Sequence, residues 1–230
     1  MGKVAVVLIG SSGLNIGECY RENYGRKVPF ILLESHKTLY QAERGAELIG
    51  HKMLETDVGT VSREAHDVSS AADISESYYK NVPDYLQGEL GSLLFFTTAE
   101  QQFASKTVEE SLDRAQFYER EIEEALAGYE HLIVVACLGG AANTAIAPYV
   151  ARLAKRQDID VSAIVTIPAM FEGKKRRQQA DKGLVALRKF SNVTLIETDQ
   201  EDESMIEYFK MKDLAIVESI EKTIKKCYEV

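Results

Sequence analysis

The stretch Leu132-Ile-Val-Val-Ala136-Cys-Leu-Gly139-Gly140-Ala-Ala-Asn143-Thr144-Ala-Ile-Ala-Pro148 decides the fold expected for this chain. It opens with a short apolar, β-branched run of the kind that forms a buried strand. Glycines and small residues follow and let the backbone turn, and an amphipathic helix is expected over residues 147–156. Asn143 and Thr144 can cap that helix, and Thr144 can donate to a phosphate oxygen.

The same alternation of apolar runs and amphipathic segments continues along the chain. Strands are expected at residues 4–9, 30–33, 132–136, 161–167 and 193–196, and helices at residues 106–127, 147–156, 174–190 and 205–228. Residues 55–105 have poor periodicity, and we expect helical pieces joined by loops there. The pattern predicts a three-layer, Rossmann-like α/β fold, a mostly parallel sheet with helices on both faces, in a single domain over residues 1–230.

Composition excludes several classes of function. The formal net charge is −9 and the pI is near 5.1, so the field of the protein repels a phosphodiester backbone and anionic lipid alike. No N-terminal apolar run is long enough for a signal peptide or a membrane span, which predicts a cytoplasmic protein. Cys19, Cys137 and Cys227 are widely spaced, and we expect reduced thiols, mostly in the core, without a metal site. The basic runs at residues 174–177 and 222–226 are expected to be solvated helix faces.

A second glycine-rich turn follows the first strand and reads Gly10-Ser-Ser-Gly13-Leu-Asn15-Ile-Gly17. Small residues at this position let backbone amides and a helix N-terminus approach a phosphate, although such turns also occur for packing reasons alone. Two strand-loop-helix turns that converge at the carboxyl ends of neighbouring strands form the crevice where open α/β sheets bind ligands.

These motifs resemble the tubulin/FtsZ family. Residues 136–148 are similar to the family's A-G-M-G-G-G-T-G-T-G-A-A-P, and Val165-Thr-Ile-Pro168-Ala-Met-Phe171-Glu172-Gly173-Lys-Lys-Arg176 is similar to V-T-x-P-F-x-F-E-G-x-x-R. The turn at residues 10–17 resembles G-Q-x-G-x-Q-I-G. The resemblance covers roughly residues 3–40 and 106–200.

The resemblance implies a guanine-nucleotide site. The two glycine turns would line the phosphates of GTP or GDP, with or without Mg²⁺, through Gly10, Ser11, Ser12, Gly13, Asn15, Gly139, Gly140, Asn143 and Thr144. Glu172 and Arg176 would contact the ribose, and Asp199 and Asp213 would lie near the guanine. The alternatives are a surface i,i+4 ion pair for Glu172 and Arg176, and solvent-facing acids for the two aspartates.

Several positions depart from the family pattern. Ala141, Ala142, Asn143 and Ala145 stand where the family has glycine or threonine, and each added Cβ narrows the approach of a phosphate. His36 replaces a magnesium-side aspartate, and Gly88-Glu-Leu-Gly91 is at most a remnant of the γ-phosphate loop. The printed chain stops where family members continue into a catalytic acidic loop and a second domain, so we expect no self-polymerisation and at most weak GTP hydrolysis.

Two hypotheses therefore stand. The first is a divergent guanine-nucleotide-binding protein of the tubulin/FtsZ type. The second is a pseudo-GTPase interaction module that has lost the nucleotide and docks on a filament-forming relative or another partner, or forms a small oligomer with itself. A Rossmann dehydrogenase is disfavoured because neither turn reads G-x-G-x-x-G with an acid about 20 residues later.

Overall fold

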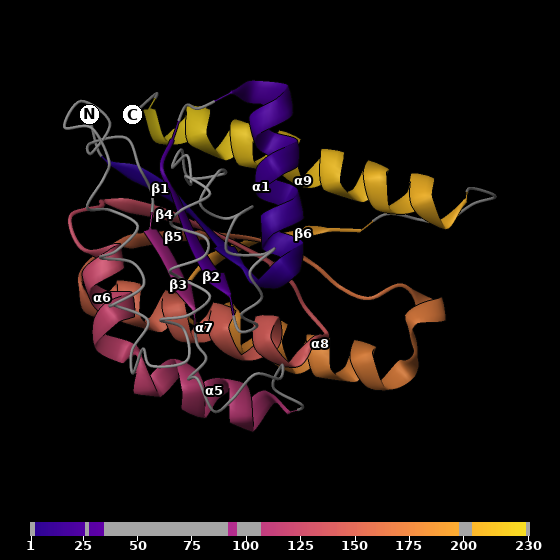
Figure 1. Ribbon diagram of the computed structural model, residues 1–230, viewed down its shortest axis with the longest axis horizontal. Coiled ribbons are helices and arrows are strands. Elements are labelled where there is room, and N and C mark those ends of the chain that lie inside the picture. The colour runs from indigo at the N-terminus through magenta and orange to yellow at the C-terminus, as the bar shows by residue number, and fades with distance from the viewer. Residues whose placement is uncertain (1–2, 26–27, 35–91, 96–106, 198–203, 229–230) are drawn as a thin grey trace, which may run out of the picture.

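The computed structural model describes residues 3–25, 28–34, 92–95, 107–197 and 204–228. Its strands form one parallel sheet in the order β3-β2-β1-β4-β5-β6 (Figure 1). The strands are β1 Val4–Ile9, β2 Phe30–Glu34, β3 Ser92–Phe95, β4 His131–Cys137, β5 Asp160–Thr166 and β6 Asn192–Ile196. The five expected strands are all present, each within one residue of its expected bounds.

Helices cover both faces of this sheet. Helices α1 Gly10–Tyr24 and α9 Met205–Tyr228 pack on one face (Figure 1). The other face carries α5 Val108–Phe117, α6 Glu119–Leu126, α7 Ala141–Arg156 and α8 Lys174–Leu187, with the short 3-10 helix η1 Met170–Glu172 just before α8. The three-layer α/β architecture expected from the alternating pattern is confirmed.

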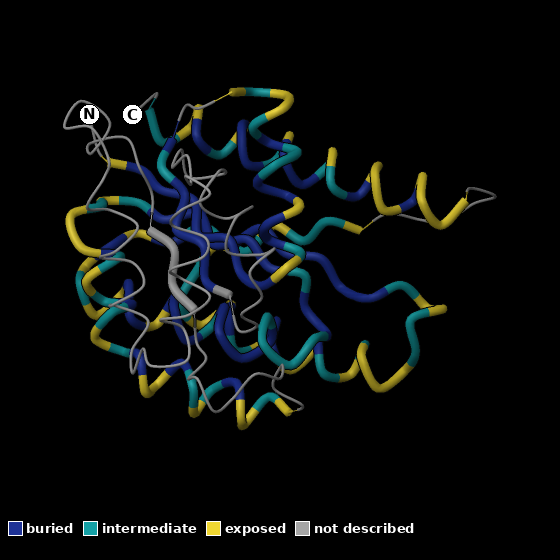
Figure 2. The backbone as a smooth tube through the Cα atoms, in the orientation of Figure 1, coloured by how far each residue is buried: buried dark blue, intermediate teal, exposed yellow. Residues whose placement is uncertain are grey.

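The core consists of two layers that the sheet separates. Strand β1 is buried along its whole length, and Figure 2 shows the central strands as a buried band. Because side chains alternate along a strand, Val7 packs with the α7 layer and Val6 with the α1 layer. The α1 layer also holds a buried polar contact, in which Tyr20 Oη donates to Glu221 Oε2 of α9 at 2.9 Å. Cys19, Cys137 and Cys227 are free and half-buried, packed against this layer rather than inside it.

The helix expected over residues 106–127 is two helices, which corrects the sequence interpretation. Thr107 caps α5 by accepting from the Glu110 N–H at 3.1 Å. The chain then leaves the helical conformation at Tyr118, where φ is −101° and ψ is 25°. The break turns the chain so that Tyr118, Ile122 and Leu126 are all buried, while Phe117 stays 70% exposed. Burying these three side chains against the sheet therefore determines the break, although the apolar residues of the segment recur with a continuous helical period.

Three further expectations differ from the structure. The helix expected at residues 174–190 ends at Leu187. The helix expected from residue 147 begins at Ala141, six residues earlier, and carries Pro148 in its interior. The segment at residues 55–105, expected to be helical pieces and loops, contributes the edge strand β3, which pairs in parallel with β2. The remnant proposed at Gly88 to Gly91, and His36, lie outside the described residues.

We expect the stability of this fold to fall as the pH drops below about 6.5, the ordinary pKa of histidine. Burial lowers the pKa of His131 in the folded state, and the Lys155 cation acts the same way, while Asp160 opposes both. The unfolded chain therefore takes up the proton first, and the stabilisation present above the unfolded pKa is lost as the pH falls. Urea unfolding across this range would show the loss, and His131→Asn should reduce its slope. An unchanged slope in the variant would contradict this assignment.

Candidate functional site

The candidate site lies where the strand order reverses direction along the chain, between the neighbouring strands β1 and β4. Their parallel register pairs Leu8 with Val135, so both strands end at the same edge of the sheet. Each strand leads within a few residues into a helix, α1 or α7. The carboxyl edge of an open α/β sheet at such a switch point is where ligands bind.

The first turn places α1 directly after β1. Gly10 has a φ of +70°, which side chains rarely adopt, and a Cβ there would lie 2.4 Å from Asn143 Oδ1. Gly13 is required by packing, because a Cβ on it would lie 2.9 Å from the backbone carbon of Leu8. Ser11 and Asn15 are exposed.

The second turn, between β4 and α7, does not cap α7 in the way that the sequence predicted. Gly140 is the N-cap of α7 and makes no side-chain cap hydrogen bond. Asn143 and Thr144 lie inside the first turn of the helix, so the prediction that they cap it was wrong. The Thr144 hydroxyl accepts from the Gly139 N–H at 2.9 Å. The Gly139 N–H, which the resemblance assigned to phosphate binding, is thus already hydrogen-bonded within the turn.

Asn143 ties the two turns together. Its Nδ2 donates to Ser12 Oγ of α1 and to the Cys137 carbonyl oxygen at the end of β4, each at 2.9 Å. The expected convergence of the two turns is therefore present. The same side chain occupies the space above Gly10, which the family's glycine would leave open.

The two glycines of the second turn have different surroundings. Gly139 has a φ of +102°, and a Cβ on it would lie 2.4 Å from Pro168 Cγ. Gly140 has a φ of −82°, and no heavy atom of the described residues lies within 4 Å of the position its Cβ would take. Gly139 is thus held by backbone conformation and packing, while Gly140 borders open space at the head of α7.

Glu172 and Arg176 form the i,i+4 ion pair that was the alternative interpretation. Arg176 Nη1 lies 2.9 Å from Glu172 Oε2, and the Arg176 side chain is 54% exposed. Glu172 Oε1 also accepts from the Ala169 N–H at 3.0 Å, which closes η1. The Arg176 carbonyl oxygen lies 3.1 Å from the Cβ position of Gly139, so this segment borders the second turn.

Glu172→Ala is expected to lower the free energy of unfolding by about 1 kcal/mol, the usual effect of losing a side-chain cap. The acceptor for the Ala169 N–H disappears, while the exposed ion pair adds little. Glu172→Gln keeps an acceptor oxygen and should stay within about 0.5 kcal/mol of the parent. Urea unfolding measures both, and equal losses in the two variants would show that the charge matters instead.

Asp213 lies on α9 and is half-buried beside α1. Burial raises the pKa of its carboxyl, and the neighbouring Lys212 cation opposes that shift. Burial raises the pKa of the Cys19 thiol on α1, and the negative charge of Asp213 raises it further. Because this charge acts on the thiol, the side chains of Cys19 and Asp213 lie near each other. The solvent-facing alternative therefore does not describe Asp213. Asp199 lies outside the described residues.

Two residues of this site were missed in the sequence. Gln179 on α8 donates from Nε2 to the Gly139 carbonyl oxygen at 3.0 Å, and Pro168 packs against Gly139. The pair Gln178-Gln179 on a helix just after the Phe-Glu-Gly segment was the available signal. Among the described residues there is no cluster of three acidic, histidine or cysteine side chains that could hold a metal. No helix in the same part of the chain is long and apolar enough to span a membrane.

Comparison with known proteins identifies similar chains. The model of the Tubulin/FtsZ family, GTPase domain, matches residues 3–201. The cell division protein FtsZ of Rickettsia bellii is 27% identical over 190 residues, which is 80% of this chain and 39% of that protein. A solved structure of an FtsZ dimer, described as empty, from M. jannaschii superimposes with a TM-score of 0.67 at 17% identity, covering 96% of this chain and 53% of that one.

A further structure, CetZ1 from Haloferax volcanii, is described as a GDP-bound monomer. It superimposes with a TM-score of 0.52 at 20% identity and covers 94% of this chain and 58% of that one. At these identities the superpositions show a shared fold. The chain spans less than two thirds of the length of each of these relatives.

Proposed function

This chain belongs to the tubulin/FtsZ family, and on that premise we propose that it is a divergent guanine-nucleotide-binding protein that binds GTP or GDP weakly. The observation that carries the proposal is the junction of two glycine turns at the switch point of the sheet, tied by Asn143. Each turn leads into a helix whose N-cap makes no side-chain hydrogen bond. Amide groups at such helix N-termini, together with the helix dipole, favour a phosphate.

The residues present fit a phosphate group at one point above all. Among the described residues nothing occupies the Cβ position of Gly140, so with respect to them a phosphate can approach the backbone at the head of α7. The Thr166 hydroxyl, at the carboxyl end of β5, is buried without a hydrogen-bond partner among the described residues. Asn15 and Ser11 are exposed at the start of α1. The nucleotide itself would supply the phosphoanhydride, with or without Mg²⁺.

Other contacts support weak binding and slow hydrolysis. The Gly139 N–H is bonded to Thr144, and Asn143 fills the space above Gly10, so a ligand must displace contacts within the protein. Neither turn, at residues 10–17 or 137–144, contains an acidic side chain. An acidic group that orients the attacking water therefore does not come from these turns.

We expect millimolar GTP or GDP to raise the melting temperature by about 3–6 °C, since a ligand that binds the folded state alone stabilises it by mass action. The estimate assumes a concentration about ten times the dissociation constant. Differential scanning fluorimetry with GTP, GDP and ATP, with and without Mg²⁺, measures the shift and the base preference. Inorganic phosphate is the control. No shift with any nucleotide would contradict the proposal.

The second candidate is the pseudo-GTPase, an interaction module that has lost the nucleotide. The hydrogen bonds of Asn143 and Thr144 favour it, because they join groups of the two turns to each other rather than leaving them for a ligand. It predicts no thermal shift with any nucleotide, and co-sedimentation of this protein with filaments of a tubulin/FtsZ relative. The same fluorimetry therefore separates the two candidates.

We further propose that these 230 residues act in the cytoplasm, as a monomer or small oligomer, and do not assemble into long filaments by themselves. Head-to-tail assembly needs two complementary faces on every subunit, and we propose that these 230 residues do not supply both. Light scattering and electron microscopy with GTP and Mg²⁺, beside a phosphate-release assay, examine both points. Long filaments, or turnover that rises cooperatively with protein concentration, would contradict this part of the proposal.

A further inference from the structure

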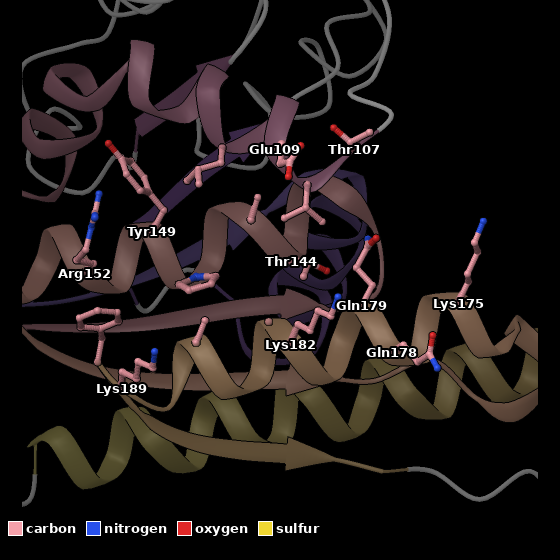
Figure 3. A pocket seen from close by; sticks show the side chains of 17 residues that line it. Thr107, Glu109, Thr144, Tyr149, Arg152, Lys175, Gln178, Gln179, Lys182 and Lys189 are labelled. Atoms are coloured by element: carbon pink, nitrogen blue, oxygen red, sulfur yellow. The ribbon is translucent and has the colours of Figure 1, made fainter.

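A groove of about 840 Å³ runs over the outer surface of α7, between α5 and α8 (Figure 3). It lies on one helical face of the sheet and extends from the head of α7, at Thr144, past Tyr149 to Phe190 beyond the end of α8. Its apolar lining residues are Val108, Leu112, Ala145, Pro148, Tyr149, Gly183, Ala186 and Phe190. The groove is therefore an elongated surface of mixed apolar and polar side chains, bounded by helices.

Basic side chains follow this groove on an otherwise acidic protein. Among the described residues its lining includes Lys175, Lys182, Lys189 and Arg152 and a single acid, Glu109, while the whole chain has a net charge of −9. Arg152 lies over the ring of Tyr149, with its guanidinium carbon 4.8 Å from the ring centre. The groove thus has the opposite sign to the rest of the molecule.

Lys175 and Lys182 lie seven residues apart on α8, so they share one side of that helix, and Lys189 follows in the turn just after its end. Figure 3 shows them along one wall, with Thr107 and Glu109 at the opposite wall. All three are exposed, and none forms an ion pair with a carboxylate in the described part of the chain. Along α8, Lys175 and Lys182 are about 10 Å apart at 1.5 Å per residue, and Lys189 continues the row past the end of the helix.

We propose that this groove is a docking site for an acidic amphipathic helix of a partner protein. The apolar floor receives the hydrophobic stripe of the helix, and acidic residues at seven-residue spacing face the lysines. A helix fits better than an extended strand, because the groove walls are helices whose backbone groups bond internally and offer no edge for β-pairing. The sequence predicts a solvated helix face for residues 174–177. The proposal adds a binding role for Lys175, which is one of these residues.

The test uses a helix-stabilised, fluorescein-labelled peptide of about 18 residues, long enough to span the row of lysines. It carries leucines on one face and glutamates at seven-residue spacing beside them, and a matched peptide carries glutamine in their place. In fluorescence anisotropy with the intact protein, the acidic peptide should bind at least about tenfold more tightly. Its affinity should also fall with added salt.

Lys182→Glu should weaken binding of the acidic peptide by at least about tenfold. Lys226→Glu makes the same charge reversal on α9, on the other face of the sheet, and should leave the affinity unchanged. Ala186→Trp fills the floor and should also abolish binding, with thermal unfolding as the check that it folds.

Three results would overturn the proposal. They are equal affinities for the acidic and glutamine peptides, no loss with Lys182→Glu, and no binding at millimolar peptide. Vesicles of phosphatidylcholine with phosphatidylserine are the comparison surface. A different result would be that the parent protein binds these vesicles but not the peptide, and that Lys182→Glu abolishes the vesicle binding. In that case the three lysines recognise a membrane surface instead of a helix.

Discussion

Gly139→Ala is expected to lower the free energy of unfolding by about 2–5 kcal/mol. The added Cβ would lie 2.4 Å from Pro168 Cγ and 3.1 Å from the Arg176 carbonyl oxygen, so the turn or α8 must shift. Overpacking of this kind costs about 1–3 kcal/mol. The φ of +102° adds backbone strain of about the same size for any residue with a side chain. Urea unfolding followed by circular dichroism measures the sum.

The neighbouring glycine provides the matched control. Gly140→Ala places the same methyl group in open space at a φ of −82°, and its cost should stay near 0.5 kcal/mol. A loss below about 1 kcal/mol for Gly139→Ala would mean that Pro168 and the turn relax freely. The rigidity assigned to this turn would then be wrong.

Gly140→Val is expected to abolish the melting-temperature increase caused by GTP or GDP while leaving the protein folded. The φ of −82° and ψ of 153° at Gly140 suit a β-branched residue, and in the part of the chain that the structure describes no heavy atom lies within 4 Å of its Cβ position. The loss of stability should be about 1 kcal/mol, since valine is a poor N-cap. The isopropyl group then stands at the head of α7, where a phosphate must approach the backbone.

A graded series makes this second result decisive. Gly140→Ala should weaken nucleotide binding less than Gly140→Val, because the methyl group excludes less of the opening. Isothermal titration calorimetry should give at least about a tenfold loss for the valine variant. If Gly140→Val binds nucleotide as tightly as the parent protein, phosphates do not approach α7 at this point, and the proposed site is misplaced.

The sheet was predictable because its signal is local and strong. Runs such as residues 4–9 and 132–136 are apolar throughout, which is what a strand covered on both faces requires. Gly10 and Gly139 were predictable too, because positive φ angles in a turn after a strand favour glycine. The convergence of the two turns followed from parallel strands that end at one edge.

The orientation of polar side chains could not be predicted in the same way. Asn143 and Thr144 suit a helix cap or a phosphate by residue type, but they bond to Ser12, Cys137 and Gly139. Those bonds depend on where α7 begins, and its start at Ala141 is set by the turn geometry at Gly140. The break at Tyr118 likewise reflects burial against the sheet, which the helical periodicity of that segment does not encode.

Gly139 also sets up a thermodynamic link between the two surfaces. Its N–H donates to Thr144 Oγ1 and its carbonyl oxygen accepts from Gln179 Nε2, and both side chains line the groove of α5, α7 and α8. A nucleotide that uses this N–H has to take it from Thr144, the residue that a docked helix contacts. Coupling of two ligands is reciprocal, so the factor by which nucleotide changes peptide affinity must equal the factor by which peptide changes nucleotide affinity. A factor other than one would show that the two binding equilibria are coupled.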